Sequence, residues 1–545
     1  MPMGHLEYPH CYPKVRFFGA HHGLIFDFDV SKDAARFLDR LPSWNTSDNS
    51  LIFQAFEWHV PSDKRHWYRL KCLLPEWQAM GIDHIWIPPG CKGMDPNGNG
   101  YDIYDLFDLG EFDQKGAIST KWGDFMELQE MIREAKFLGV NVIWDAVLNH
   151  KAGADYSEGF QAIAVDPKER NKDISSPQEI HGWTGFDFSG RGDKYSSMKY
   201  HWQHFTGVDW DQKLETNDIY KILGPEKDWA SDVSTENGNY DYLMFADLEH
   251  SNPEVCADLL HWGSWITNLL SISGMRLDAA KHFSTRFQKK FIQHVRDNSN
   301  PKFFVIGEYW AHNVSDIQDY LENLDYQAMA YDVPLLKKFS TISETPCADL
   351  RTIFSDTLVQ SRPGHAVTFV ANHDTQPGQM LETPVASSFK LAAYALILLR
   401  KDGLPCIFYG DMYGLNVEGS RAPACDGKLP LLAQARKQFA YGEQENYFDE
   451  PNCVGFVRYG NANHSGLACL ISNGGRSKKR MFIGRQHTNT QWIDILGYHD
   501  RRVVIDKRGY GNFPINASCV GVWVEATAVR RDHLEKNLYA RLFLL

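Results

Sequence analysis

Four short stretches decide the fold of this chain: VNVIWDAVLNH (140–150), GMRLDAAKH (274–282), KFFVIGEYW (302–310) and AVTFVANHD (366–374). Each contains a short, largely apolar run that is followed by charged or polar side chains. An apolar run of this length is typical of a strand buried on both faces, as in a parallel sheet. We therefore expect four parallel strands that carry polar residues at their carboxyl ends.

Similar runs at 51–58, 84–89, 328–335 and 404–411 bring the number of predicted strands to eight. Amphipathic helix patterns lie between strands, for example at 127–139, 255–270, 287–298 and 389–402. The Ser251-Asn-Pro-Glu254 spacing predicts a capping box at the start of the helix at 255. Eight such alternations predict an α/β protein built on a (β/α)8 TIM barrel. A doubly wound open sheet is the alternative, although no G-x-G-x-x-G turn follows the first strand.

Two intervals depart from this alternation. Roughly a hundred residues separate His150 from the helix at 255, which is too long for an ordinary loop. We expect an inserted domain B at 151–251, after strand 3, between the two parts of the barrel at 49–150 and 252–442. Short strands separated by Gly and Asn predict a C-terminal β-sandwich domain at 443–527. Residues 1–48 are an N-terminal extension of unknown role, and 528–545 are a tail.

Composition excludes several classes of protein. The chain has 545 residues, with 56 Lys and Arg against 69 Asp and Glu, which gives a net charge of −13. This balance argues against a nucleic-acid partner or an anionic membrane, since both favour clustered positive charge. Apolar residues make up 43% of the chain, which excludes global disorder. The aromatic share of 13% fits either core packing or stacking on sugars.

The N-terminal region and the cysteines predict a location. The first thirty residues contain no unbroken apolar run, so we expect no secretory signal. The ten cysteines form no C-x-x-C pair, which favours a reduced, intracellular protein without a disulfide framework or a zinc–thiolate site. We therefore expect a cytoplasmic protein, and no protein partner is implied.

The strand ends bring three carboxylates to one rim of the predicted barrel: Asp278, Glu308 and Asp374. Retaining glycoside hydrolysis requires one carboxylate as the nucleophile and a second carboxyl as the acid and then the base. Arg276, two residues from Asp278 on the same side of the strand, should lower the pKa of that carboxyl and keep it ionised as the nucleophile. The apolar neighbours of Glu308 should favour its protonated form as the acid. Asp374 is placed to bind sugar hydroxyls.

Three histidines also end predicted strands or open the following loops: His150, His282 and His373. A single histidine is more often a structural hydrogen-bonding group than a substrate contact. Three at neighbouring strand ends predict one polar pocket.

A metal site is also predicted. The segment DYLMFADLE supplies Asp241, Asp247 and Glu249, and Asn149 ends the third strand. Oxygen ligands favour Ca²⁺ over zinc, and such a site would join the insert to the barrel. A solvated acidic loop is the alternative.

The four stretches resemble the signature segments of the α-amylase family of glycoside hydrolases. The resemblance is closest to the bacterial liquefying type and its intracellular fungal relatives. It extends to LIFQAFEWHVP, WIPPGCKGM, ENGNYDYLMFADLE and FYGDMYG, and covers the chain from about residue 50 to 525. It implies a TIM-barrel domain A, an inserted domain B and a β-sandwich domain C.

The resemblance also implies an activity and roles for single residues. It makes Asp278 the nucleophile, Glu308 the general acid/base and Asp374 the transition-state stabiliser. The implied substrate-binding residues are Tyr101, His150, Arg276, Lys281, His282, Trp310 and His373. The implied reaction is endo-hydrolysis of α-1,4-glucosidic bonds in starch, glycogen or maltooligosaccharides with anomeric retention.

For Ca²⁺, the resemblance implies ligands at Asn149, Asp241, Asp247 and the main-chain carbonyl of His282. Glu249 stands where the relatives usually carry Asp. Thr206 replaces an aspartate that bacterial liquefying enzymes share between metals, so the resemblance supports one principal calcium rather than a cluster.

Two other functions remain open at this point. An α-glucanotransferase of the same family would carry identical catalytic residues and pass the glycosyl group to a sugar instead of water. An inactive glucan-binding protein would be expected to lack a catalytic carboxylate, whereas this chain has all three.

Overall fold

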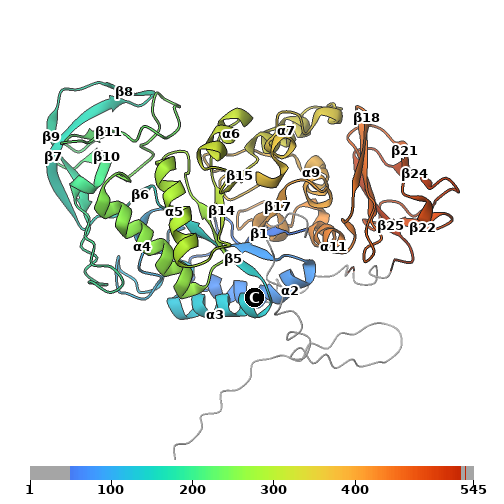
Figure 1. Cartoon of the computed structure of the whole chain (residues 1–545), viewed down its shortest axis with the longest axis horizontal. Helices are drawn as coiled ribbons and strands as arrows, with labels where there is room; N and C mark the ends of the chain where they lie inside the picture. The colour runs from blue at the N-terminus through green and yellow to red at the C-terminus, as the bar shows by residue number, and fades with distance from the viewer. Residues whose placement is uncertain (1–48, 529–533, 535–545) are drawn as a thin grey trace, which may run out of the picture. The chain divides into compact units, whose positions relative to one another are not determined.

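The computed structural model describes residues 49–528 and residue 534, and its centre is a closed barrel of parallel strands (Figure 1). Around the barrel the strands follow chain order: β1 (Ile52–Gln54), β2 (His84–Trp86), β5 (Asn141–Ala146), β13 (Gly274–Leu277), β14 (Phe304–Gly307), β15 (Met329–Tyr331), β16 (Ala366–Thr368) and β17 (Leu404–Phe408). Each predicted strand range contains one of these strands. The predicted TIM barrel is confirmed.

Helices alternate with the strands and pack around the barrel (Figure 1). They are α2 (His66–Met80), α3 (Phe125–Phe137), α4 (Pro253–Leu270), α5 (Thr285–Asn298), α6 (Val314–Asn323), α7 (Val333–Glu344), α8 (Leu358–Ser361), α9 (Ser387–Leu399), α10 (Tyr409–Tyr413) and α11 (Leu429–Phe439). One apolar cluster fills the barrel and the space beneath the helices, with Trp67, Trp144 and Trp262 fully buried in it.

Two local predictions were wrong. The N-cap of α4 is Asn252, whose side chain accepts from the backbone N–H groups of Glu254 and Val255, whereas the Ser251 hydroxyl donates to Glu249. Asn252 takes the cap because Pro253 fits the first helical position directly after it. The strand expected over 328–335 ends at Tyr331, and the next residue caps α7.

The insert after the third barrel strand is a β-sheet in the order β6-β12-β10-β11-β7-β8, with β9 paired to β7 (Figure 1). Its strands are β6 (His150–Lys151), β7 (Tyr156–Asp166), β8 (Glu169–Asp173), β9 (Gln178–Gly185), β10 (Phe205–Asp211), β11 (Thr216–Ile222) and β12 (Ala246–Leu248). β6 directly follows the end of β5, so the insert's sheet starts at the rim of the barrel.

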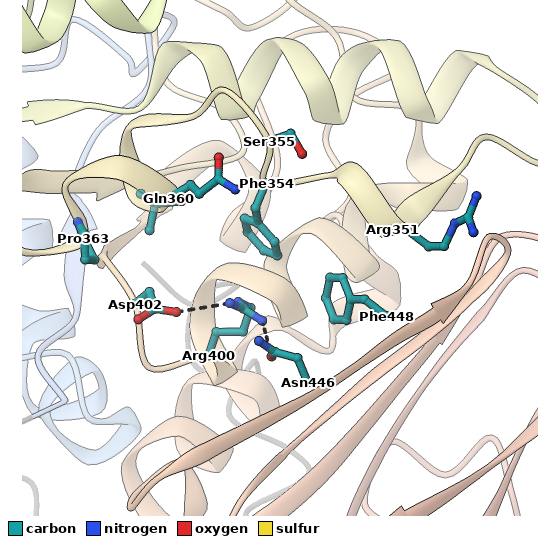
Figure 2. Close-up of a pocket in the computed structure, with 10 residues that line it drawn as sticks. Arg351, Phe354, Ser355, Gln360, Pro363, Arg400, Asp402, Asn446 and Phe448 are labelled. Atoms are coloured by element: carbon teal, nitrogen blue, oxygen red, sulfur yellow. Dashed lines mark hydrogen bonds and ion pairs between the residues drawn. The ribbon is translucent and has the colours of Figure 1, made fainter.

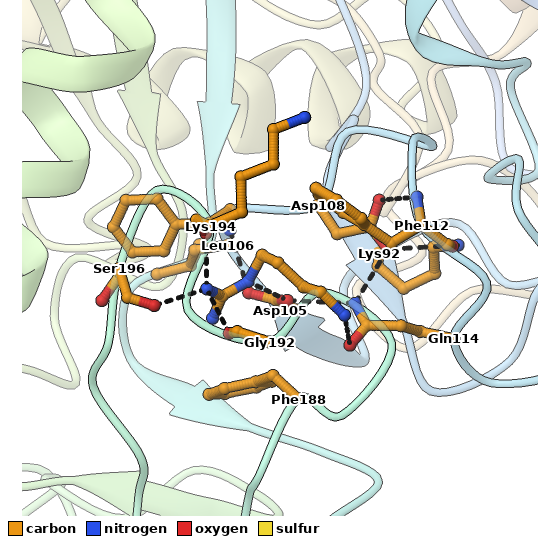
Figure 3. A network of polar contacts seen from close by, with 12 residues as sticks. Lys92, Asp105, Leu106, Asp108, Phe112, Gln114, Phe188, Gly192, Lys194 and Ser196 are labelled. Carbon is orange, nitrogen blue, oxygen red and sulfur yellow. Dashed lines mark hydrogen bonds and ion pairs between the residues drawn. The ribbon is translucent and has the colours of Figure 1, made fainter.

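Two buried cations hold the loops after β2 in place (Figure 3), and one of them, Arg191, joins these loops to the insert. Lys92, in β3 (Lys92–Gly93), donates to three carbonyls at 2.6–3.0 Å and pairs with Asp108 at 3.3 Å. Arg191, in the insert, donates from Nε to Asp105 at 2.7 Å and from Nη1 to three carbonyls. Asp105 ends β4 (Ile103–Asp105), which follows the loop that carries Tyr101. The network therefore fixes that loop against the insert.

The C-terminal region forms two sheets that share the apolar cluster of Met481, Phe513, Trp492 and Trp523. One sheet contains β18 (Gln444–Glu450), β19 (Cys453–Arg458), β20 (Leu467–Ser472), β25 (Cys519–Glu525), β22 (Gln491–Asp494) and β23 (Val503–Val504). The other pairs β21 (Ser477–Phe482) with β24 (Tyr510–Ile515). The two sheets pack around one core, as predicted for a β-sandwich. The exact domain limits at 150, 251 and 442 remain a prediction.

Some predictions concern residues outside the described part of the chain, namely the extension at 1–48 and most of the tail. The nine cysteines within the described part are free, and Cys406 and Cys469 are buried as expected. None of the helices described combines the length and apolar character that a membrane span requires.

Candidate active site

The barrel register brings the predicted catalytic residues to one rim. β13 pairs with β5 so that Arg276 lies beside Asp145, and it pairs with β14 on its other side. Asp278 and Glu308 are the first residues after β13 and β14. Because Leu277 pairs with Gly307, these two residues leave the barrel at the same level.

Arg276 is the centre of the site and is fully buried. Its Nη1 donates to Asp145 Oδ1 at 2.8 Å and to Asp278 Oδ1 at 2.6 Å. Its Nη2 forms an ion pair with Glu308 Oε1 at 2.5 Å, and Glu308 Oε2 accepts from the Ala279 N–H at 2.9 Å. One guanidinium thus orients two of the three predicted catalytic carboxyls. The prediction of apolar surroundings for the Glu308 carboxyl was wrong, since both of its oxygens have polar partners.

Burial raises the pKa of Asp278 to about 8, because burial and the repulsion from Glu308 together outweigh the opposing effect of Arg276. The expectation that Arg276 lowers this pKa was therefore wrong in its net direction. Burial and the charge of Glu308 also hold the pKa of Asp374 well above its usual range. Since several buried carboxyls share one guanidinium, the cluster retains protons at neutral pH.

Asp374 and His373 lie in the loop after β16 and face the same rim. His373 Nε2 lies 3.0 Å from Asp374 Oδ2, and its Nδ1 is hydrogen-bonded to Gln54 Nε2 at 2.9 Å. Burial holds the pKa of His373 well below its usual range, so the ring is neutral at neutral pH. The neutral imidazole therefore lies beside the Asp374 carboxyl, and among the described residues its Nε2 has no hydrogen-bond partner.

An aromatic wall borders the carboxylates. The Tyr101 hydroxyl donates to Asp145 Oδ2 at 2.9 Å, and its ring stacks on His373 with centroids 5.1 Å apart. His150 Nε2 is bonded to the Tyr101 carbonyl at 2.8 Å. Trp58 is nearly parallel to both rings, with its centroid 5.9 Å from that of Tyr101 and 6.0 Å from that of His373. The sequence analysis did not select Trp58, although its position just after the first strand was a signal for it.

A second group of residues joins the barrel rim to the insert. Lys281 Nζ donates to the Trp310 carbonyl at 3.1 Å and to Glu236 Oε2 of the insert at 2.7 Å. His282 Nδ1 is bonded to the Tyr240 carbonyl at 2.9 Å, and burial lowers its pKa to about 3. Glu236 was not selected from the sequence, because nothing local links it to Lys281.

The residues expected to bind calcium lie where the insert meets the barrel. Asp247 accepts from Asn149 Nδ2 at 3.1 Å and from the Thr206 hydroxyl at 2.5 Å, while Asp241 accepts from the Ala230 N–H at 2.9 Å. Burial raises the pKa of Asp241 to about 7 and that of Asp247 well above its usual range. Among the residues that the structure describes, Asn149 Oδ1 is buried without a hydrogen-bond partner. Two buried carboxyls and an unsatisfied amide oxygen fit a hard cation.

Glu249 is placed differently from these ligands. Its carboxylate pairs with Lys227, whose ammonium also donates to the carbonyls of Gln203 and Phe205 at 2.9 Å. An internal cation therefore already neutralises Glu249. Within the described residues, no group of three or more His, Cys, Asp or Glu side chains is arranged to hold a metal.

Comparison with known proteins gives a consistent result. Residues 74–427 match the family described as "Alpha amylase, catalytic domain". The chain is 44% identical to an alpha-amylase of Bacillus licheniformis over 88% of its own length and 94% of that protein. It is 38% identical to the cytoplasmic alpha-amylase of Escherichia coli over 87% of its length and 99% of that protein. The fold matches a crystal structure of an alpha-amylase from Geobacillus thermoleovorans complexed with acarbose, with a TM-score of 0.59, 17% identity, and coverage of 89% and 99% of the two chains.

Proposed function

Because this chain belongs to the α-amylase family of glycoside hydrolases, we propose that it cleaves internal α-1,4-glucosidic bonds of starch, glycogen or maltooligosaccharides with Asp278, Glu308 and Asp374 as catalytic carboxyls. The observation that carries this proposal is the contact of one buried guanidinium with both Asp278 and Glu308. Two carboxyls oriented side by side at one rim are what a retaining glycosidase requires.

The reaction proceeds in two steps. The reactive form is the one in which Asp278 has released its proton and Glu308 has kept its own. In that form the Asp278 carboxylate attacks the anomeric carbon and forms a glycosyl ester, while Glu308 donates its proton to the departing glycosidic oxygen. Glu308 then takes a proton from water, which attacks the anomeric carbon and releases Asp278, so that the α configuration is retained. Arg276 keeps the Asp278 carboxylate in position, and the Asp374 carboxyl hydrogen-bonds sugar hydroxyls as charge develops.

The surrounding side chains hold the glucan. Tyr101 and Trp58 offer aromatic faces to the sugar rings on one side of the cleavage point. The neutral His150 and His373 hydrogen-bond the sugar at the cleavage point. Lys281, His282 and Trp310 bind the departing chain.

We include a structural Ca²⁺ in the proposal. Asn149, Asp241, Asp247 and the His282 carbonyl would hold it, and its charge would offset the two buried carboxyls and join the insert to the rim. Glu249 is the weakest member of the predicted ligand set, because Lys227 neutralises it. The ion takes no part in the proton transfers.

The location and domain limits belong to the same proposal. A cytoplasmic location agrees with the name of the E. coli relative. The proposed limits are 49–150 and 252–442 for the barrel, 151–251 for the insert and 443–527 for the C-terminal domain.

The roles of the two central carboxyls are tested by comparing Glu308→Gln with Asp278→Asn. Loss of the general acid should reduce starch hydrolysis by at least ~10³-fold but spare the first step for an aryl maltooligosaccharide with a good leaving group. Added azide should then rescue turnover in Glu308→Gln, giving a glycosyl azide, and should not rescue Asp278→Asn.

Glu322→Gln on the exposed face of α6 is the matched control and should leave activity unchanged. Undiminished starch hydrolysis in Glu308→Gln would show that the acid is assigned wrongly. Product analysis on maltoheptaose separates hydrolysis from transfer, since products longer than the substrate identify a glucanotransferase.

A further inference from the structure

A cavity of about 340 Å³ (Figure 2) lies at the end of the barrel opposite the catalytic rim. Its lining includes Pro363, just before β16, and Arg400 and Asp402, just before β17. The catalytic carboxyls follow the carboxyl ends of their strands, so the cavity opens at the amino ends. The segment from Arg351 to Gln360 forms a second part of the wall, and Asn446 and Phe448 on β18 form a third. The volume is within the ~300–1,000 Å³ range of small-ligand sites.

The charges that line this cavity are already compensated. Arg400 donates to Asp402 Oδ2 at 3.1 Å and to Asn446 Oδ1 at 2.8 Å, as Figure 2 shows. Arg351 is paired with Asp349 at 2.8 Å. With each guanidinium matched by a carboxylate, the cavity has no excess positive charge to attract an anion. Its electrostatics favour a neutral ligand.

The lining nevertheless offers directional hydrogen bonds. In the described part of the chain, the Asn446 side-chain oxygen accepts hydrogen bonds from Arg400 and Gln444. The Gln360 side-chain oxygen accepts one from the Asp356 N–H, and neither side-chain NH₂ group has a partner there. Both NH₂ groups therefore remain to donate to a ligand. Asp402 uses Oδ2 for Arg400 and keeps Oδ1 as an acceptor, with its side chain 39% exposed.

Two aromatic side chains give the cavity an apolar surface. Phe354 and Phe448 are half-buried, and their ring centroids lie 6.1 Å apart. Arg400 packs on Phe354 at 4.3 Å, which holds the guanidinium and the ring in place. Amide donors, a carboxylate acceptor and aromatic rings together suit a ligand with hydroxyl groups at its edges and C–H groups on its faces.

We propose that this cavity binds a short segment of neutral α-glucan, at a site separate from the catalytic cleft. The proposal rests on the proposed function, because the substrate of an α-amylase is a polymer long enough to reach a second site. Binding at two places on one polymer raises the apparent affinity for the polymer without changing the cleavage of short oligosaccharides.

The test compares polymer binding with short-substrate turnover. Phe448→Ala removes one aromatic wall, and Gln360→Trp fills the cavity from an exposed position on α8. Each change is combined with Glu308→Gln, so that glycogen is not digested during affinity gel electrophoresis. Both variants should bind glycogen about threefold to tenfold more weakly, as expected for loss of one aromatic contact. In the active background, kcat/KM for an aryl maltotrioside should not change.

Phe137→Ala, which removes a 55% exposed phenylalanine on α3, is the matched control and should not alter glycogen binding. If glycogen in the gel slows the Gln360→Trp variant as much as the parent protein, the proposal is overturned, even if Phe448→Ala fails to fold. If inorganic phosphate competes with glycogen for the cavity and maltose does not, the assignment of a neutral ligand is overturned. A wild-type enzyme that does not cleave the trioside would instead refute the proposed function.

Discussion

Asp278→Asn should abolish activity and at the same time stabilise the folded protein at neutral and alkaline pH. Loss of the nucleophile should reduce kcat/KM on starch by at least ~10⁴-fold, or about 5 kcal/mol of transition-state stabilisation. The stability effect follows from the burial of this carboxyl, which raises its pKa to about 8 in the folded chain from an ordinary 3.8.

The sign and size follow from proton linkage. Between pH 3.8 and about 8 the folded state binds this proton while the unfolded state has released it, so the free energy of unfolding falls as the pH rises. One such proton changes that free energy by about 1.4 kcal/mol per pH unit, hence by at most roughly 2.7 kcal/mol between pH 5 and pH 7. Asparagine does not ionise, so the variant should lack this decline.

The assay is the melting temperature of both proteins at pH 5, 6, 7 and 8 in saturating calcium. The advantage of Asp278→Asn over wild type should grow by about 2–4 °C from pH 5 to pH 7, because the entropy of unfolding scales with chain length. Asp356→Asn, at a carboxyl that is 87% exposed, is the control and should show no such trend. A melting difference that does not vary with pH would refute the assignment of the retained proton to Asp278.

Three further predictions concern the metal, the insert and the aromatic wall. Chelation should lower the melting temperature of the wild type by several degrees, and Asp247→Asn should abolish that response; an unchanged melting temperature on chelation would count against the calcium site. Arg191→Met should lower the free energy of unfolding by about 3–5 kcal/mol, because Asp105 is left buried without its ionic partner; a melting temperature equal to that of the wild type would contradict this. Trp58→Ala should raise KM for maltoheptaose about twofold to tenfold with a smaller change in kcat, measured by steady-state kinetics. An unaltered KM would remove Trp58 from the substrate wall.

Much of the barrel and the catalytic rim was predictable from local patterns. A parallel strand buried on both faces is largely apolar, so stretches such as 140–150 and 366–374 stand out in the sequence. Polar residues at the ends of such strands meet at one rim, because parallel strands share their direction. This reasoning selected Asp278 and Glu308 before any contact was known.

The sequence by itself therefore determined the strand order of the barrel and the side chains at its rim, since both depend on periodicity and chain direction. Only the tertiary structure decided the pKa of Asp278, because desolvation depends on what covers the carboxyl rather than on its neighbour Arg276. It also decided the pairing of Glu249 with Lys227 and of Lys281 with Glu236, which join residues more than twenty positions apart. The first contact forms when the insert itself folds, and the second when the insert packs on the barrel, so no local pattern in the chain encodes their distances.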